Sequence, residues 1–73
     1  MDEYVVVVYP DDRAVYLDGQ AFGRTGELLT VQRGTHTFGL GLPVDYRPIQ
    51  QSVLVKDTSM DADGRKKVYF EKI

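Results

Sequence analysis

Large apolar side chains recur at every second position along much of the chain, which is the period of a β-strand with one buried face. In the segment 36–42 they alternate with threonine and glycine, at His36, Phe38, Leu40 and Leu42. The unbroken run Tyr4–Tyr9 is rich in β-branched residues and is typical of a strand covered on both faces. No segment keeps a helical period over three turns. The pattern therefore predicts an all-β fold.

Turn signals at short intervals separate these runs. Asp18-Gly19 is a residue pair that accepts positive φ at both centres of a type I′ turn and so predicts a tight hairpin. Gly23 and Gly26 bracket a loop or bulge. We expect about seven short antiparallel strands in a β-sandwich. Eight residues are predicted to share its interior: Val5, Val7, Val15, Leu17, Phe38, Leu40, Val53 and Val55.

Composition narrows the class of protein. The 73 residues suffice for one domain, 1–73, with a thin core, and the chain has no cysteine to form a disulfide or a zinc site. A net charge of -2 argues against a nucleic-acid-binding protein. We expect no membrane span and no signal peptide, because no apolar run is long enough and the first residues are acidic. The composition and the absence of cysteine do not determine the cellular compartment of the protein.

The order of these elements resembles that of a PEGA domain over residues 10–55, about two thirds of the chain. The matching segments are Val15–Gly19, Gly23–Thr25, Leu28–Val31, Gly34–Phe38, Asp45–Pro48 and Val53–Val55. The last predicted strand, Arg65–Ile73, lies outside the match. The resemblance implies a prealbumin-like β-sandwich that serves as an accessory module in bacterial or archaeal surface, envelope or regulatory proteins. It implies an envelope or extracellular location and no catalytic residues.

The sequence offers little basis for an enzyme or a cofactor site. His36 is the only histidine, and no serine or cysteine motif accompanies it as a nucleophile. The adjacent acids Asp11 and Asp12 lie on one turn, where neighbouring side chains point apart, so they are rejected as a glycosidase pair. We predict a protein that is not an enzyme and carries no cofactor.

A calcium site is one interpretation of the acidic segment 57–64. Ser59, Asp61 and Asp63 precede Gly64 in the spacing of the first half of a calcium-binding loop, with Ser59 in place of the first aspartate. The candidate ligands are Asp57, Asp61 and Asp63. The twelfth position of such a loop requires a bidentate acid, and here it is Phe70. A solvated hairpin loop that closes at Asp63-Gly64 is the favoured interpretation, and no metal site is predicted.

Aromatic and arginine side chains are the candidates for binding. Tyr and Arg bury a large area with few rotors and are enriched at binding hot spots. Tyr46 and Arg47 lie between two prolines and are predicted to be presented rigidly, and Tyr16 and Phe22 are further candidates. The alternative is that the tyrosines cap the edges of the core. We expect a non-catalytic interaction module that binds a protein or a cell-envelope glycan.

A second hypothesis is a structural role. An edge strand such as Tyr4–Tyr9 or Lys66–Phe70 is predicted to pair with a neighbouring domain or with a second copy of the chain, which would make the protein a homo-oligomer. The lysines near the C-terminal strand have the opposite effect, because charges protect an edge against pairing.

Overall fold

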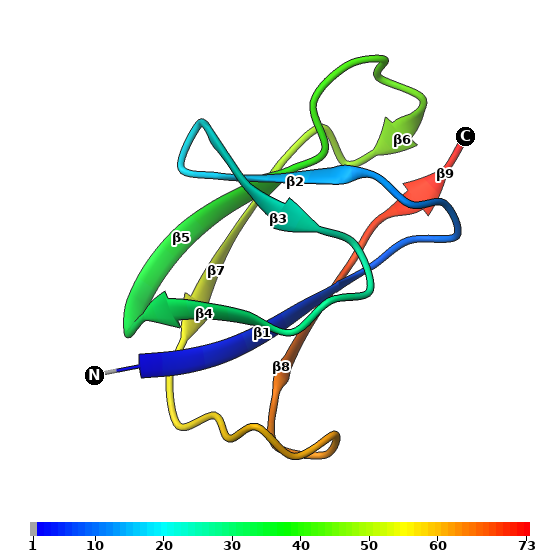
Figure 1. Ribbon diagram of the computed structural model, residues 1–73. Helices are drawn as coiled ribbons and strands as arrows, with labels where there is room; N and C mark the ends of the chain where they lie inside the picture. Colours follow the sequence, from blue (N-terminus) through cyan, green and yellow to red (C-terminus); the bar gives the residue numbers. More distant parts are fainter. Residues whose placement is uncertain (1) are drawn as a thin grey trace.

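The computed structural model describes residues 2–73 as an all-β protein in which two sheets face each other (Figure 1). The first sheet has the order β4 (Leu29–Gln32), β1 (Asp2–Val8), β8 (Lys66–Tyr69). The second has the order β3 (Gln20–Arg24), β2 (Ala14–Leu17), β5 (Gly34–Gly39), β7 (Gln51–Val55). A third, two-stranded sheet joins β6 (Tyr46–Arg47) to β9 (Glu71–Lys72). The predicted all-β sandwich is confirmed.

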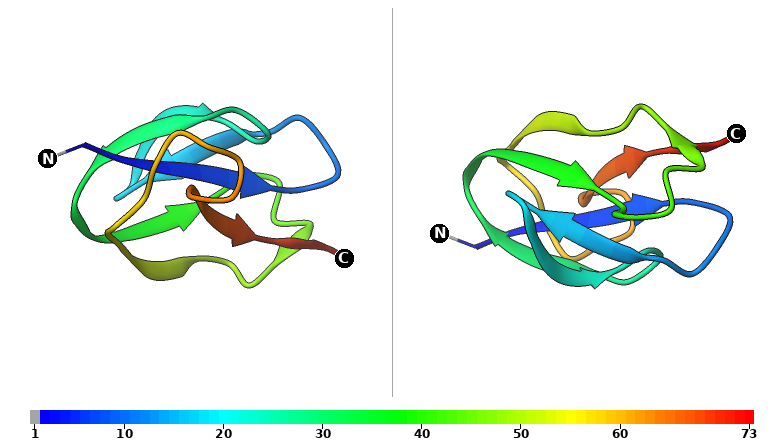
Figure 2. Two further views of the ribbon diagram at one scale, coloured as in Figure 1. Left: turned by 90° about the horizontal axis from the view of Figure 1, so that it is seen from below. Right: turned by 90° about the horizontal axis from the view of Figure 1, so that it is seen from above.

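Strand β1 occupies the centre of the first sheet, which corrects the prediction that Tyr4–Tyr9 is a free edge. It pairs with β4 on one side, antiparallel, and with β8 on the other. The β1–β8 pair is parallel, with Val5 opposite Lys66 and Val7 opposite Val68, whereas we expected antiparallel strands throughout. Both strands run toward the end of the molecule where β9 finishes (Figure 2). Strand β8 does form an edge, as its lysines indicate.

The core lies between the two larger sheets and is built from alternate residues of their strands. Of the eight residues predicted for it, six are fully buried, and Leu17 and Val53 pack against them partly exposed. The other buried apolar residues are Leu29, Val31, Tyr46, Val68 and Phe70. The residues predicted to be buried from the spacing of apolar positions therefore supply the larger part of the core.

The turn between β2 and β3 has the geometry that its residues predict. Asp18 and Gly19 both have positive φ, 51° and 87°. The pairing then shifts register, because Val15 lies opposite Gly23 while Tyr16 lies opposite Ala21. Phe22 is the extra residue of this bulge. The chain then returns toward the other sheet, where the Leu29 side chain lies so close to Gly23 that a Cβ atom there would require the leucine to move.

The strand indicated by the alternation over 36–42 ends earlier than its pattern predicts. Strand β5 ends at Gly39, and Gly41 has a φ of +71° that only glycine adopts easily. Leu42 therefore leaves the apolar face on which its spacing had placed it and is 85% exposed. Strand β7 begins at Gln51, so Ile49 is also outside the sheet and is exposed.

Candidate functional site

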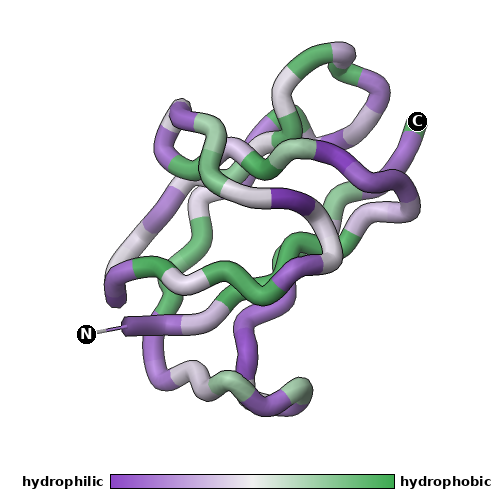
Figure 3. The backbone as a smooth tube through the Cα atoms, in the orientation of Figure 1, coloured by the Kyte–Doolittle hydropathy of each residue, from purple (hydrophilic) through white to green (hydrophobic). Residues whose placement is uncertain are grey.

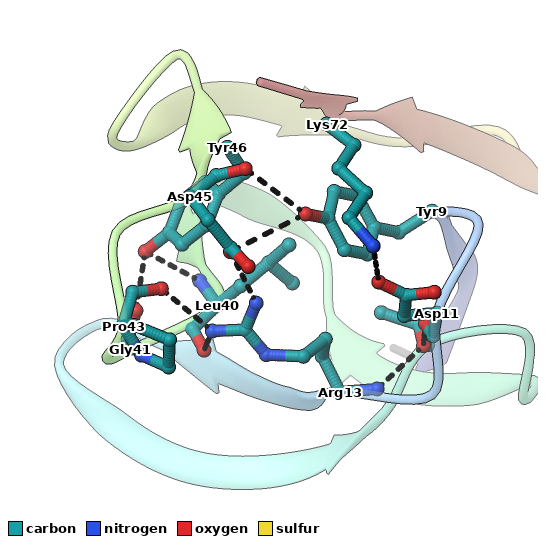
Figure 4. A network of polar contacts seen from close by, with 10 residues as sticks. Tyr9, Asp11, Arg13, Leu40, Gly41, Pro43, Asp45, Tyr46 and Lys72 are labelled. Atoms are coloured by element: carbon teal, nitrogen blue, oxygen red, sulfur yellow. Dashed lines mark hydrogen bonds and ion pairs between the residues drawn. The ribbon is translucent and has the colours of Figure 1, made fainter.

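The loop between β5 and β6, residues 40–45, is held against the body of the protein by contacts centred on Arg13 (Figure 4). The guanidinium of Arg13 donates through Nη1 to Oδ1 of Asp45 at 2.7 Å. Through Nη2 it donates to the carbonyl oxygens of Leu40 at 3.3 Å and Pro43 at 2.9 Å. Three acceptors spread along six residues thus converge on a single planar group, which uses the fork geometry that distinguishes arginine from lysine.

The backbone of Arg13 is itself held in place by Thr25. The Thr25 hydroxyl accepts from the Arg13 amide at 3.0 Å and donates to the Asp11 carbonyl at 2.8 Å, while the Thr25 amide donates to the Arg13 carbonyl at 2.9 Å. Thr25 is the last residue of the Gly-Xaa-Thr segment at 23–25 and is 9% exposed. This segment therefore positions the arginine, which in turn positions the loop.

Two tyrosines enclose the guanidinium. It lies 5.9 Å from the ring centre of Tyr9 and 5.5 Å from that of Tyr46, within the range of a cation–π interaction. The Tyr46 hydroxyl donates to the Gly41 carbonyl at 2.9 Å and accepts from the Leu40 amide at 3.3 Å. The Tyr9 hydroxyl approaches the Asp45 carbonyl at 3.3 Å. Both rings therefore fix the loop as well as covering the core.

The charges around the loop neutralise one another. Hydrogen bonding from Arg13, followed by its positive charge, holds the pKa of Asp45 below its ordinary value despite partial burial. Burial raises the pKa of Tyr9, and the Asp45 carboxylate adds to the shift. At the rim, Lys72 donates to Asp11 at 2.6 Å, and this bond raises the pKa of the lysine. The site therefore presents no isolated charge among these groups.

The fixed loop exposes apolar side chains to solvent. Leu42 is 85% exposed and Val44 is 48% exposed. The hydropathy-coloured backbone trace shows apolar stretches on this loop (Figure 3). Ile49, which follows β6, is 65% exposed. Exposed apolar side chains on an ordered loop are suited to contact with another surface, because little conformational freedom remains to be lost on binding.

The residues predicted for binding do not form one site. Tyr46 is buried at 3% exposure, so the expectation that it is presented to a partner is wrong: its ring fills the core under the loop. Arg47 is exposed and forms an ion pair with Glu71 at 2.9 Å. The Tyr16 ring lies against Gly41, where a Cβ atom would come within 2.6 Å of it. Phe22 is 48% exposed but lies on edge strand β3.

The acidic segment after β7 does not gather its carboxylates into a calcium site. Residues 2–73 contain no group of three acidic, histidine or cysteine side chains arranged to hold a metal ion. Asp57 forms an ion pair with Arg33 at 3.1 Å. The carbonyl oxygens of Met60 and Asp61 accept from Arg65, so the cation facing these carbonyls belongs to the chain itself. The calcium interpretation of Asp57, Asp61 and Asp63 is therefore not supported.

His36 bridges three elements at the far end of the second sheet. Its Nδ1 lies 2.8 Å from Oδ2 of Asp18, and its Nε2 lies 2.7 Å from the Gln32 carbonyl. Both partners are acceptors, so both bonds form only when both ring nitrogens carry a proton. The hydrogen bond to Asp18, and then the one to Gln32, raises the pKa of His36. Its side chain is 15% exposed, and its role is to tie the β2–β3 turn to β5.

Glu3 is a buried carboxylate that anchors the loop between β7 and β8. It is 2% exposed and accepts from the Thr58 amide at 2.9 Å and the Thr58 hydroxyl at 2.6 Å. Arg33 donates to its other oxygen at 3.2 Å. The bonds from Thr58, followed by the interaction with Arg33, lower the pKa of Glu3 against the opposing effect of desolvation. This cluster is structural.

No protein-family model, curated protein sequence or solved structure matches the chain. The resemblance to PEGA domains stays a prediction that rests on the order and spacing of its motifs. Within residues 2–73 no helix could cross a membrane, since that part of the chain is all strand and loop. No pocket is present in the same part of the molecule.

Proposed function

We propose that the protein is a non-catalytic interaction module that binds a partner protein through the β5–β6 loop, residues 40–45. The observation that carries this proposal is that Leu42, 85% exposed, extends from a loop held by three hydrogen bonds from Arg13. A folded protein gains nothing in stability from an apolar side chain left in water. An exposed leucine on a fixed loop is suited to insertion into an apolar pocket of another protein.

The surroundings of Leu42 support a protein as the partner. Val44 on the same loop is also exposed and apolar, and the adjoining strand β6 carries the exposed ion pair of Arg47 with Glu71. Apolar groups next to polar ones are typical of protein interfaces. The nearby charges at Arg13 and Asp45 already satisfy each other. Covering the loop would therefore bury apolar area without stripping water from an unpaired charge.

Glycan binding is the alternative, and the aromatic residues give it less support. Sugars stack on exposed aromatic faces, whereas the Tyr46 ring is buried and the Tyr16 ring lies against Gly41. The aromatic side chains that remain most exposed are Phe22 and Tyr69. They belong to β3 and β8, edge strands of different sheets, and so do not provide a common platform.

A photo-crosslinking amino acid placed at position 42 tests the proposal in cells that make the protein. A matched control carries the same group at Thr30, an exposed position on β4 in the other sheet. We expect a discrete, protease-sensitive adduct from position 42 that is absent from position 30 and is competed by excess wild-type protein. The competing protein carrying Leu42→Ser should fail to suppress it.

Three outcomes of this experiment would count against the proposal. Identical adducts from both positions would indicate non-specific contact, and no adduct from position 42 would remove the loop as the binding surface. An adduct that resists protease but is cleaved by glycosidases would favour the glycan alternative.

A further inference from the structure

Among residues 2–73, strand β7 has a strand partner on only one side of its backbone. It forms the edge of the order β3-β2-β5-β7 and pairs with β5 over five residues, from Gly34 opposite Val55 to Phe38 opposite Gln51. In the described part of the chain, no ladder joins β7 to β8, the nearest edge of the other sheet. A side-chain bond from the Gln51 amide to the Tyr69 carbonyl connects the two. The outer edge of β7 is thus a template for strand addition.

The β7 edge lacks the features with which proteins protect such edges. Its sequence, Gln51–Val55, contains no charge, no proline and no glycine, and its pairing with β5 has no bulge. Strand β8, by contrast, carries Lys66 and Lys67. Charged side chains, prolines and bulges are the usual means of preventing edge-to-edge pairing. The other edges of the two sheets are also better protected than β7.

The remaining two edges are covered where they meet. Strand β3 has a bulge at Phe22 and ends on Arg24. Strand β4 faces β3, because the Leu29 side chain packs directly under Gly23. The chain that leaves β3 also bonds across the gap, through the Gly26 amide to the Val7 carbonyl at 2.9 Å. Of the edges of the two larger sheets, β7 is therefore the one that is open, regular and uncharged.

We infer that β7 is the surface through which the protein binds a second copy of itself, by antiparallel β7–β7 pairing. An antiparallel pair of identical strands has a two-fold axis, so the same backbone groups of both copies satisfy each other. The two four-stranded sheets become one eight-stranded sheet. Because β7 carries no charge, identical residues meet across the axis without repulsion.

The outer face of β7 supplies apolar contact to this pairing. Leu54 lies opposite Thr35 on the face that points away from the core, and it is 53% exposed. Across a two-fold axis it comes near its own counterpart or the exposed Ser52 of the other copy, depending on register. This surface is separate from the β5–β6 loop, so the inference does not depend on the proposed function.

Self-association is tested by sedimentation and light scattering of the whole chain at concentrations from about 10 μM to about 1 mM. This range suits a weak interface, because the pairing of two short strands buries less than the ~800 Å² per partner of stable complexes. We expect a reversible monomer–dimer equilibrium. Leu54→Lys should raise the dissociation constant at least about tenfold, because it places two lysines near the axis. Thr30→Lys, a change at an exposed position on β4, should leave it unchanged.

Amide hydrogen exchange locates the contact independently of any variant. Protection of the β7 amides that do not bond to β5 should rise with protein concentration, while protection in β4 stays constant. If Leu54→Lys does not fold, Ser52→Lys on the same face replaces it. A monomer at every concentration would refute the inference, as would dissociation by Thr30→Lys. A dimer broken by Leu42→Ser and not by Leu54→Lys would assign the contact to the loop and also refute it.

Discussion

Replacing Arg13 by methionine removes the group that holds the β5–β6 loop while keeping a flexible apolar side chain of similar length. The change deletes two hydrogen bonds to the carbonyls of Leu40 and Pro43, the ion pair with Asp45, and two cation–π contacts. Leu40 is 1% exposed, so its carbonyl has little access to water as a substitute donor. Asp45 is 41% exposed and hydrates readily once the arginine is gone.

The cost follows from these contacts. Hydrogen bonds from a charged donor contribute about 1.5–3 kcal/mol each, at the lower end where water competes. Each cation–π contact adds about 0.5–1 kcal/mol. Since the methionine side chain still covers part of the core and the contributions overlap, we expect Arg13→Met to lower the free energy of unfolding by about 3 kcal/mol. For a domain of this size, that corresponds to a melting temperature lower by about 10–25 °C.

The measurement is urea denaturation followed by circular dichroism, with Arg24→Met as the matched control. Arg24 also forms an ion pair, with Asp12 at 2.8 Å, but both side chains are at least half exposed, so its loss should change little. Arg13→Lys should fall between the two, because an ammonium group keeps the charge but cannot reach three acceptors in a fixed fork. Equal effects of Arg13→Met and Arg24→Met would refute the assignment of Arg13 as the anchor of the loop.

Three further predictions concern groups away from the loop. Deprotonation of His36 breaks its hydrogen bond to Asp18 or to the Gln32 carbonyl. The contribution of His36 to the free energy of unfolding should therefore be fully present below its unfolded pKa of 6.5 and fall by about 1 kcal/mol as the pH rises through its raised folded pKa. His36→Gln should abolish this pH dependence of the urea midpoint. Glu3 has a lowered pKa, so its contribution is present above 4.5 and lost as pH falls through the folded value. Glu3→Gln should accordingly lower the urea midpoint at neutral pH and flatten its acid dependence, and an effect no larger than that of Glu27→Gln at an exposed site would contradict the burial argument. Millimolar calcium should leave the thermal midpoint unchanged, and a clear rise would restore the acidic segment as a metal site.

The fold could be predicted from local patterns wherever one strand face is buried. Val5 and Val7 of β1 and Val55 of β7 lie inward as their spacing indicates, whereas Val8 on the other face of β1 is 36% exposed. The Asp18-Gly19 turn has the expected positive φ values. Pattern could not reveal the partner of each strand. The valine run of β1 is compatible with a central strand and also with an aggregation-prone edge strand. It is a central strand because β8 pairs with its second side.

The conformation of the β5–β6 loop could not be predicted from the sequence, and the reason is physical. Leu42 continues a perfect two-residue alternation, and nothing local shows that Gly41 turns the chain out of the sheet. Arg13 reads as an ordinary polar residue before a strand, because its partners lie about 30 residues away, at Leu40, Pro43 and Asp45. Tyr46 between prolines has the composition of a binding residue, yet its ring is needed in the core of so small a domain.

The parallel pairing of β1 with β8 has a consequence for how the chain folds. Val5 lies opposite Lys66, so the most N-terminal strand of the fold is completed by a strand that follows all the strands of the other large sheet. Such a contact closes a long loop, and folds dominated by pairings between residues far apart in the sequence form slowly. Until β8 arrives, the valines of β1 have an open side on which another nascent chain can dock. During synthesis, the side of β1 that β8 covers in the folded protein is therefore exposed for a time and can pair with another chain.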